Sequence, residues 1–217
     1  MLEPAEPEAF VRANTVIAAP PLVPEIKLHL ASEIVPLWHA TEASMAKIQL
    51  PPPYWGFAWA GGQALARYLL DHPERARGKS ALDFGAGSGL VAIAAARAGA
   101  VVTAAEIDPY ARAAICLNAA LNGVAIEIES SDVIGRADTP WRLILVGDMC
   151  YERPLAERLT AWLRSLAREG AEVLLGDPGR AYLPKTGLEA LARYDVPTTR
   201  ELEDRESREG VVWRLTA

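Results

Sequence analysis

The sequence has few cysteines and no excess of basic residues. Its two cysteines, Cys116 and Cys150, are too few for a disulfide scaffold, and a chain of 217 residues can bury a core without one. The formal net charge of −6 argues against an attraction of the whole chain to a phosphate backbone. We therefore expect a protein of a reducing compartment, the cytoplasm, whose main partner is not a nucleic acid.

Long hydrophobic runs are also missing. The most apolar stretch, residues 90–105, contains Arg97 and is too short to span a bilayer. Glutamates at positions 3, 6 and 8 stand where a signal peptide needs a basic region followed by an apolar core. The composition instead combines 51% hydrophobic with 23% charged residues, which is typical of one folded domain. We expect a soluble protein that does not associate with membranes.

The pattern of the chain changes near residue 50. Prolines interrupt the first fifty residues repeatedly, so we interpret residues 1–50 as an N-terminal helical arm, with short pieces such as 25–30, packed on a domain of residues 51–217. That domain begins with three prolines and a cluster of aromatic residues, and a helical pattern then runs to Leu70.

Strands and helices alternate after Leu70. Short apolar runs predict strands at 80–84, 101–105, 125–129, 143–146 and 171–175. Helical patterns lie between them at 90–98, from the Asp108-Pro109 cap to Asn122-Gly123, and at 154–168; a further helix near 188–194 precedes two antiparallel strands at 199–202 and 211–215. This alternation predicts an α/β fold with a Rossmann-like, doubly wound, mostly parallel seven-stranded sheet.

Acidic residues follow the predicted strands. Ligands in a doubly wound sheet bind beyond the carboxyl ends of the strands, so these residues are candidates for a binding site. They are Asp83, Glu106 with Asp108, Asp132, Asp148 and Asp177. Any one of them alone is also typical of a helix cap, since aspartate is a preferred capping residue.

The glycine-rich loop 85–89 after the first predicted strand indicates which ligand binds. Its glycines permit a tight turn and a close approach of backbone to ligand, but Leu90 stands where a nicotinamide-binding loop has its third glycine. Asp83 would repel a pyrophosphate and hold an amino group, while Glu106 can accept hydrogen bonds from ribose and Asp132 lies near an adenine edge. These features favour S-adenosylmethionine.

Several segments carry a resemblance to a known family. The motif Asp83-Phe84-Gly85-Ala86-Gly87-Ser88-Gly89 resembles motif I of the class I (seven-strand) methyltransferases. Residues 53–70, 147–152 and 176–180, with 23–26 and 36–38 in the arm, are similar to the electron transfer flavoprotein β-subunit lysine methyltransferases, which carry a D-x-x-Y/F element after the fourth strand. Cys150 and Ala60 depart from the family pattern, where an aromatic residue and a proline are expected, and this bears on the fit of the substrate.

The resemblance implies a monomeric, S-adenosylmethionine-dependent protein-lysine N-methyltransferase that acts on the β subunit of electron transfer flavoprotein and releases S-adenosylhomocysteine. Asp148 and Tyr151 would be catalytic, and Trp55, Phe57 or Trp59 would contact a cation with an aromatic face. The residues expected to bind the cofactor are Trp59, Asp83, Gly85, Gly87, Gly89, Glu106, Ile107, Asp132 and Asp148.

Two alternatives remain open from the sequence. The same fold serves small-molecule amine methyltransferases, because fold and cofactor do not determine the acceptor. A non-catalytic module that binds the cofactor and acts through a partner is the other. No metal is expected, since His29, His39 and His72 lack the spacing of metal ligands.

Overall fold

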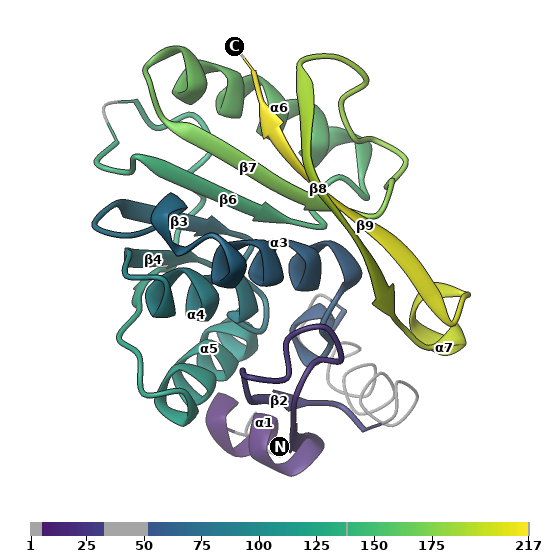
Figure 1. Cartoon of the computed structure of the whole chain (residues 1–217). Helices are drawn as coiled ribbons and strands as arrows, with labels where there is room; N and C mark the ends of the chain where they lie inside the picture. Colours follow the sequence, from purple (N-terminus) through teal and green to yellow (C-terminus); the bar gives the residue numbers. More distant parts are fainter. Residues whose placement is uncertain (1–5, 33–51, 138, 217) are drawn as a thin grey trace.

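The computed structural model describes residues 6–32, 52–137 and 139–216, and a seven-stranded sheet forms its centre (Figure 1). The strands are β3 (Ser80–Phe84), β4 (Val101–Ala105), β5 (Glu127–Glu129), β6 (Leu143–Gly147), β7 (Glu172–Asp177), β8 (Leu188–Pro197) and β9 (Ser207–Leu215). Strands β3 to β7 are parallel, whereas β9 lies antiparallel between β7 and β8. The predicted mostly parallel seven-stranded α/β sheet is confirmed.

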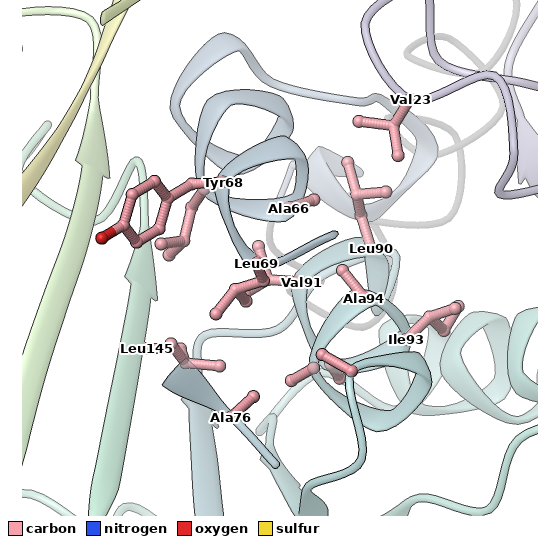
Figure 2. Packing of buried hydrophobic residues seen from close by; sticks show 14 of the residues in the cluster. Val23, Ala66, Tyr68, Leu69, Ala76, Leu90, Val91, Ile93, Ala94 and Leu145 are labelled. Carbon is pink, nitrogen blue, oxygen red and sulfur yellow. The ribbon is translucent and has the colours of Figure 1, made fainter. Parts of the chain in front are cut away.

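Helices cover both faces of the sheet (Figure 1). They are α3 (Ala60–Asp71), α4 (Leu90–Arg97) and α5 (Pro109–Leu121) on one face and α6 (Arg153–Arg168) on the other. Because side chains alternate along a strand, Leu143 and Leu145 of β6 enter the core under α3 and α4, and Ile144 and Val146 enter the core under α6. Figure 2 shows Leu145 in the first of these cores, together with Leu69 of α3.

The strand order indicates where a ligand would bind, beyond the carboxyl ends of the central strands. The order is β5-β4-β3-β6-β7-β9-β8, so the chain runs outward from β3 through β4 and β5 and then returns to β6 on the other side of β3. Ligands of doubly wound sheets bind where the direction reverses, beyond the carboxyl ends of the strands. Here that place lies between β3 and β6.

The N-terminal segment packs on the helices of the first face. Its elements are α1 (Pro7–Asn14), β1 (Val16–Ala18) and β2 (Leu28–Leu30). The prediction of a helical piece at 25–30 is wrong. Instead, β2 pairs with β1, and the N–H of His29 donates to Asn118 Oδ1 of α5 at 2.7 Å. Val23 and Ile26 are fully buried in the core under α3 and α4. The boundary at residue 50 and the segment 36–38 lie outside the described residues.

The C-terminal elements differ from the prediction. Residues 188–194, expected as a helix, belong to β8, and the strand expected at 199–202 falls in the short helix α7 (Arg200–Glu203). Leu, Glu, Ala and Arg in residues 188–193 favour a helix locally, but pairing with β9 along nine residue positions overrides that preference. No helix in the described ranges is long and apolar enough to cross a membrane.

Candidate active site

A cavity of about 470 Å³ lies at the edge of the sheet where β3, β4 and β6 end. The acidic residues that line it are Asp83, Glu106, Asp108, Asp132 and Asp148. The predicted gathering of strand-end carboxylates at one site is therefore observed for these five. Asp177, at the end of β7, is not among the lining residues and is buried.

The glycine loop forms one wall of the cavity. Gly85 and Gly87 line it with φ values of +64° and +52°, a conformation that favours glycine. A β-carbon on Gly85 would lie 2.5 Å from the sulfur of Met149, a flexible side chain that would have to move, so the need for glycine rests mainly on the positive φ. Gly89 has a different place: it caps α4 with a φ of +79° beside Ile115, outside the cavity lining. Its contact with a cofactor stays a prediction.

Glu106 joins the glycine loop to the segment after β4. Its Oε2 accepts a hydrogen bond from the N–H of Gly87, and its Oε1 accepts one from the N–H of Asp108, both at 3.0 Å. An ionised carboxylate has about four acceptor positions, so two remain for the hydroxyls of a ribose. Asp108 itself accepts from the N–H of Tyr110 at 2.8 Å and caps α5, as the sequence predicted.

Asp83 lies at the floor of the cavity with 1% of its surface exposed. Its Oδ2 accepts a hydrogen bond from the N–H of Ala92 in α4 at 2.9 Å. Burial raises the pKa of Asp83 to about 8, and the carboxylate of Glu106 adds to the rise while the hydrogen bond opposes it. A cation placed beside Asp83 would therefore stabilise its ionised form.

Asp148, predicted to be catalytic, follows β6 in an unusual backbone conformation. Its φ is +58°, and its N–H donates to the carbonyl of Gly176 on β7 at 2.9 Å. Its Oδ2 accepts a hydrogen bond from the N–H of Gly62 at 2.7 Å, so the carboxylate caps the start of α3. Asp148 thus accepts an N–H in the first turn of a helix and also lines the cavity, while its role in binding or catalysis stays a prediction.

The other oxygen of Asp148 is bound by Arg180. Arg180 Nη2 and Nε donate to Asp148 Oδ1 at 2.8 and 3.1 Å. Burial raises the pKa of Asp148 to about 7; the Arg180 charge opposes the rise and the carboxylate of Asp177 adds to it.

Aromatic side chains form the opposite wall. Tyr54, Trp55, Phe57, Trp59 and Tyr151 all line the cavity. The rings of Tyr54 and Tyr151 lie 5.5 Å apart, and the Arg180 guanidinium lies 5.5 Å from the ring of Trp59. Trp55 and Phe57 are buried against α5 and so are mainly part of the core, whereas Tyr151 is 42% exposed and accessible to a substrate.

The remaining predicted positions lie toward the outer end of the site. Ile107 and Asp132 line the cavity, and Asp132 pairs with Arg158 of α6 at 2.9 Å. Their contacts with a cofactor stay predictions. Cys150 and Ala60, which depart from the family pattern, are buried outside the lining of the cavity. Among the described residues, no group of three or more histidine, cysteine and acidic side chains is placed to hold a metal.

Sequence reasoning did not assign a role to Arg180. It lies three residues after Asp177 in a loop, within the segment 176–180 that resembles the family, but no periodicity or spacing indicated what its side chain does. One signal could have pointed to an arginine here. Carboxylates buried at the ends of neighbouring strands require a compensating cation.

Comparisons with known proteins show which family the sequence is similar to. The family model described as ribosomal protein L11 methyltransferase (PrmA) matches residues 30–143. The electron transfer flavoprotein β-subunit lysine methyltransferase of Xenopus laevis is 40% identical over 217 residues, covering 95% of this chain and 86% of the relative. That of Danio rerio is 38% identical over 213 residues, covering 94% and 81%.

A solved structure shares the fold. Magnesium protoporphyrin IX methyltransferase (ChlM) from Synechocystis PCC 6803, with SAM bound, superposes with a TM-score of 0.53 at 15% identity, covering 72% of this chain and 78% of that chain. At this identity the likeness concerns the fold alone.

Proposed function

The chain belongs to the family of the electron transfer flavoprotein β-subunit lysine methyltransferases, and we propose that the protein it methylates is the β subunit of electron transfer flavoprotein in its own organism. It is an S-adenosylmethionine-dependent enzyme that methylates protein lysines. The observation that carries the choice of substrate is the 40% identity that extends over 95% of the chain.

The described residues fit the cofactor. Gly87 has a positive φ and would place a β-carbon no nearer than 3.8 Å to another atom, so the cavity is open at this point of the loop. Glu106 retains free acceptor positions for ribose hydroxyls, and buried Asp83 would balance a cationic amino group. When bound, S-adenosylmethionine supplies a methyl group on a positively charged sulfur. The site therefore brings acidic side chains toward a cationic ligand and has no need of a phosphate-binding group.

The amine that accepts the methyl group must be neutral, whereas a free lysine has a pKa of about 10.4 and is protonated at neutral pH. We assign the orientation of this amine to Asp148. Its Oδ1 is occupied by Arg180, but among the described residues Oδ2 receives only the N–H of Gly62, which leaves acceptor capacity for the substrate. The exposed ring of Tyr151 would bound the path of the lysine side chain.

Methylation of the purified β subunit tests the substrate directly. We expect transfer of a labelled methyl group to lysines of the β subunit, located by mass spectrometry, and we expect Asp148→Asn to reduce the rate at least about 100-fold, within the range for groups that orient a nucleophile. Cofactor binding is measured in parallel. Absence of labelled lysine with intact cofactor binding would contradict the proposed substrate.

We also propose that the enzyme acts as a monomer in the cytoplasm and not on nucleic acid. The net charge of −6 supports the exclusion of nucleic acid, and Cys116 and Cys150, which form no disulfide, support a reducing compartment such as the cytoplasm. Light scattering, cell fractionation and methylation assays with RNA test the three parts separately.

The acidic charge of the enzyme further favours a basic loop on the protein substrate, so the association of the two proteins should weaken as the salt concentration rises.

A further inference from the structure

Arg180 connects the candidate catalytic carboxylate to the C-terminal part of the sheet. Beyond its two bonds to Asp148, its Nη1 and Nη2 donate to Glu203 Oε2 and Oε1 at 3.0 and 2.6 Å. Glu203 belongs to α7, on the connection between β8 and β9 (Figure 1). One guanidinium thus bridges two carboxylates that come from distant parts of the chain.

Further contacts hold Arg180 in position. Its own N–H donates to Asp177 Oδ1 at 2.6 Å, and its guanidinium lies near the ring of Trp59. Glu203 has 1% of its side chain exposed and is also paired with Arg208 at 3.4 Å. A side chain held in this way keeps one geometry, so the direction of its hydrogen bonds to Asp148 is fixed.

The charges around Asp148 show why its contact with Arg180 is important. Asp148 and Asp177 end neighbouring strands and are 8% and 1% exposed, and Asp177 Oδ2 has no hydrogen-bond partner among the described residues. The buried thiol of Cys150 feels the charge of the same two carboxylates, while Arg180 donates to Asp148. Without that cation, an ionised Asp148 would lie beside a second carboxylate in a poorly solvated place.

We propose that Arg180 is a positioning residue for methyl transfer, which keeps the carboxylate of Asp148 ionised and turned so that Oδ2 remains available to the substrate amine. This role rests on the proposed function of Asp148. Because Arg180 acts through Asp148, its removal affects the ionisation of Asp148 first and the rate as a consequence.

Arginine suits this role better than lysine. The planar guanidinium donates two hydrogen bonds to one oxygen of Asp148 and one to each oxygen of Glu203, whereas an ammonium is a point charge that cannot hold both carboxylates in fixed directions. Arg180→Lys should therefore keep part of the effect on ionisation and lose part of the orientation. Arg180→Gln should lose both.

The experiment measures the ionisation of Asp148 without a substrate. The protein is labelled with ¹³C at aspartate carboxyls, the signal of Asp148 is identified by its loss in Asp148→Asn, and its titration is compared among variants. We expect Arg180→Gln to raise the midpoint by roughly 1 pH unit or more, as for removal of a close opposite charge, and Arg180→Lys to raise it less. The control Arg193→Gln, which breaks an exposed pair with Glu209, should leave it unchanged.

Activity supplies the second readout. In Arg180→Gln, kcat/KM toward the flavoprotein β subunit should fall up to about tenfold at pH 7 for every pH unit by which the Asp148 midpoint rises, and it should recover as the pH rises. A merely structural role would reduce the rate equally at all pH values. An unchanged Asp148 midpoint in Arg180→Gln and Arg180→Lys overturns the inference. Lack of flavoprotein methylation by the unmodified enzyme contradicts the proposed function instead, and the titration still decides the role of Arg180.

Discussion

The backbones of Gly61 and Gly176 are in direct contact. A β-carbon on Gly61 would lie 2.2 Å from the carbonyl oxygen of Gly176, and one on Gly176 would lie 2.1 Å from the carbonyl oxygen of Gly61. This approach brings the start of α3 against the end of β7, where Asp148 accepts the N–H of Gly62 and donates to Gly176. The position of Asp148 thus depends on two residues that carry no side chain.

We expect Gly61→Ala to destabilise the fold by about 1–3 kcal/mol, because backbone atoms cannot move aside as the end of a side chain can. Tm should fall by about 2–4 °C for each kcal/mol at this chain length. Gly62→Ala is the matched control: its β-carbon would lie 3.9 Å from Val91 and 4.0 Å from Asp148, which is ordinary contact. Equal Tm values for the two variants in calorimetry would show that the contact is not tight.

Cofactor binding should release a proton through Asp83. The pKa of about 8 means that Asp83 is mostly protonated at pH 7 in the free protein, and a bound cation lowers the pKa of a neighbouring carboxyl. Affinity should therefore rise from pH 6 to 8 and level off above the pKa. Calorimetry in two buffers of different ionisation enthalpy measures the released proton.

The control for Asp83 is Asp83→Asn, whose amide oxygen still accepts the N–H of Ala92. Asp108 and Asp148 also line the cavity with pKa values raised by burial to about 6 and 7, so the difference between variant and unmodified protein isolates Asp83. Equal proton release in both proteins would contradict the prediction.

Local sequence signals were sufficient for the parallel part of the fold. Strands β3 and β4 begin and end at the predicted residues, and Asp108 with Pro109 begins α5 as expected, because capping and apolar runs act over a few residues. Residues 188–194, predicted as a helix, show the opposite case, because they belong to β8. Their helix-favouring composition is overruled by pairing with β9, which no local pattern reveals.

The candidate site was predictable to a similar degree. Strand ends mark Asp83, Glu106 and Asp148, since parallel strands deliver their carboxyl ends to one edge of the sheet. Arg180 could not be placed from the sequence, because its partners Asp148 and Glu203 lie 32 and 23 positions away along the chain. Contacts of that kind depend on the assembled sheet.

Cys150 should be chemically inert in the folded protein. It is 2% exposed, and burial raises the pKa of its thiol to about 12, with the carboxylates of Asp177 and Asp148 adding to the rise. The reactive form of cysteine is the thiolate. We expect iodoacetamide at pH 8 to modify exposed Cys116 and spare Cys150, and to modify both in guanidinium chloride, as read by mass spectrometry. Equal modification rates in the folded protein would contradict this.

The hydroxyl of Tyr151 should contribute to methyl transfer and not to cofactor affinity. Tyr151 lines the cavity beside Tyr54, three residues after Asp148, and burial raises the pKa of its hydroxyl, so it remains a neutral donor and acceptor at working pH. Loss of one neutral hydrogen bond is worth about 0.5–1.5 kcal/mol, so Tyr151→Phe should lower kcat/KM by roughly 2- to 12-fold.

The comparison for Tyr151 is Tyr182→Phe. Tyr182 has a similar exposure, 37% against 42%, and its ring lies under Arg153 outside the lining of the cavity. Kd for the cofactor should stay within about twofold in both variants, since neither hydroxyl is assigned to it and a twofold change is less than the effect of one hydrogen bond. Of these two tyrosines, only Tyr151 lines the cavity that the lysine is proposed to enter. An equal loss of activity in both variants would therefore show that the hydroxyl of Tyr151 acts through general stability.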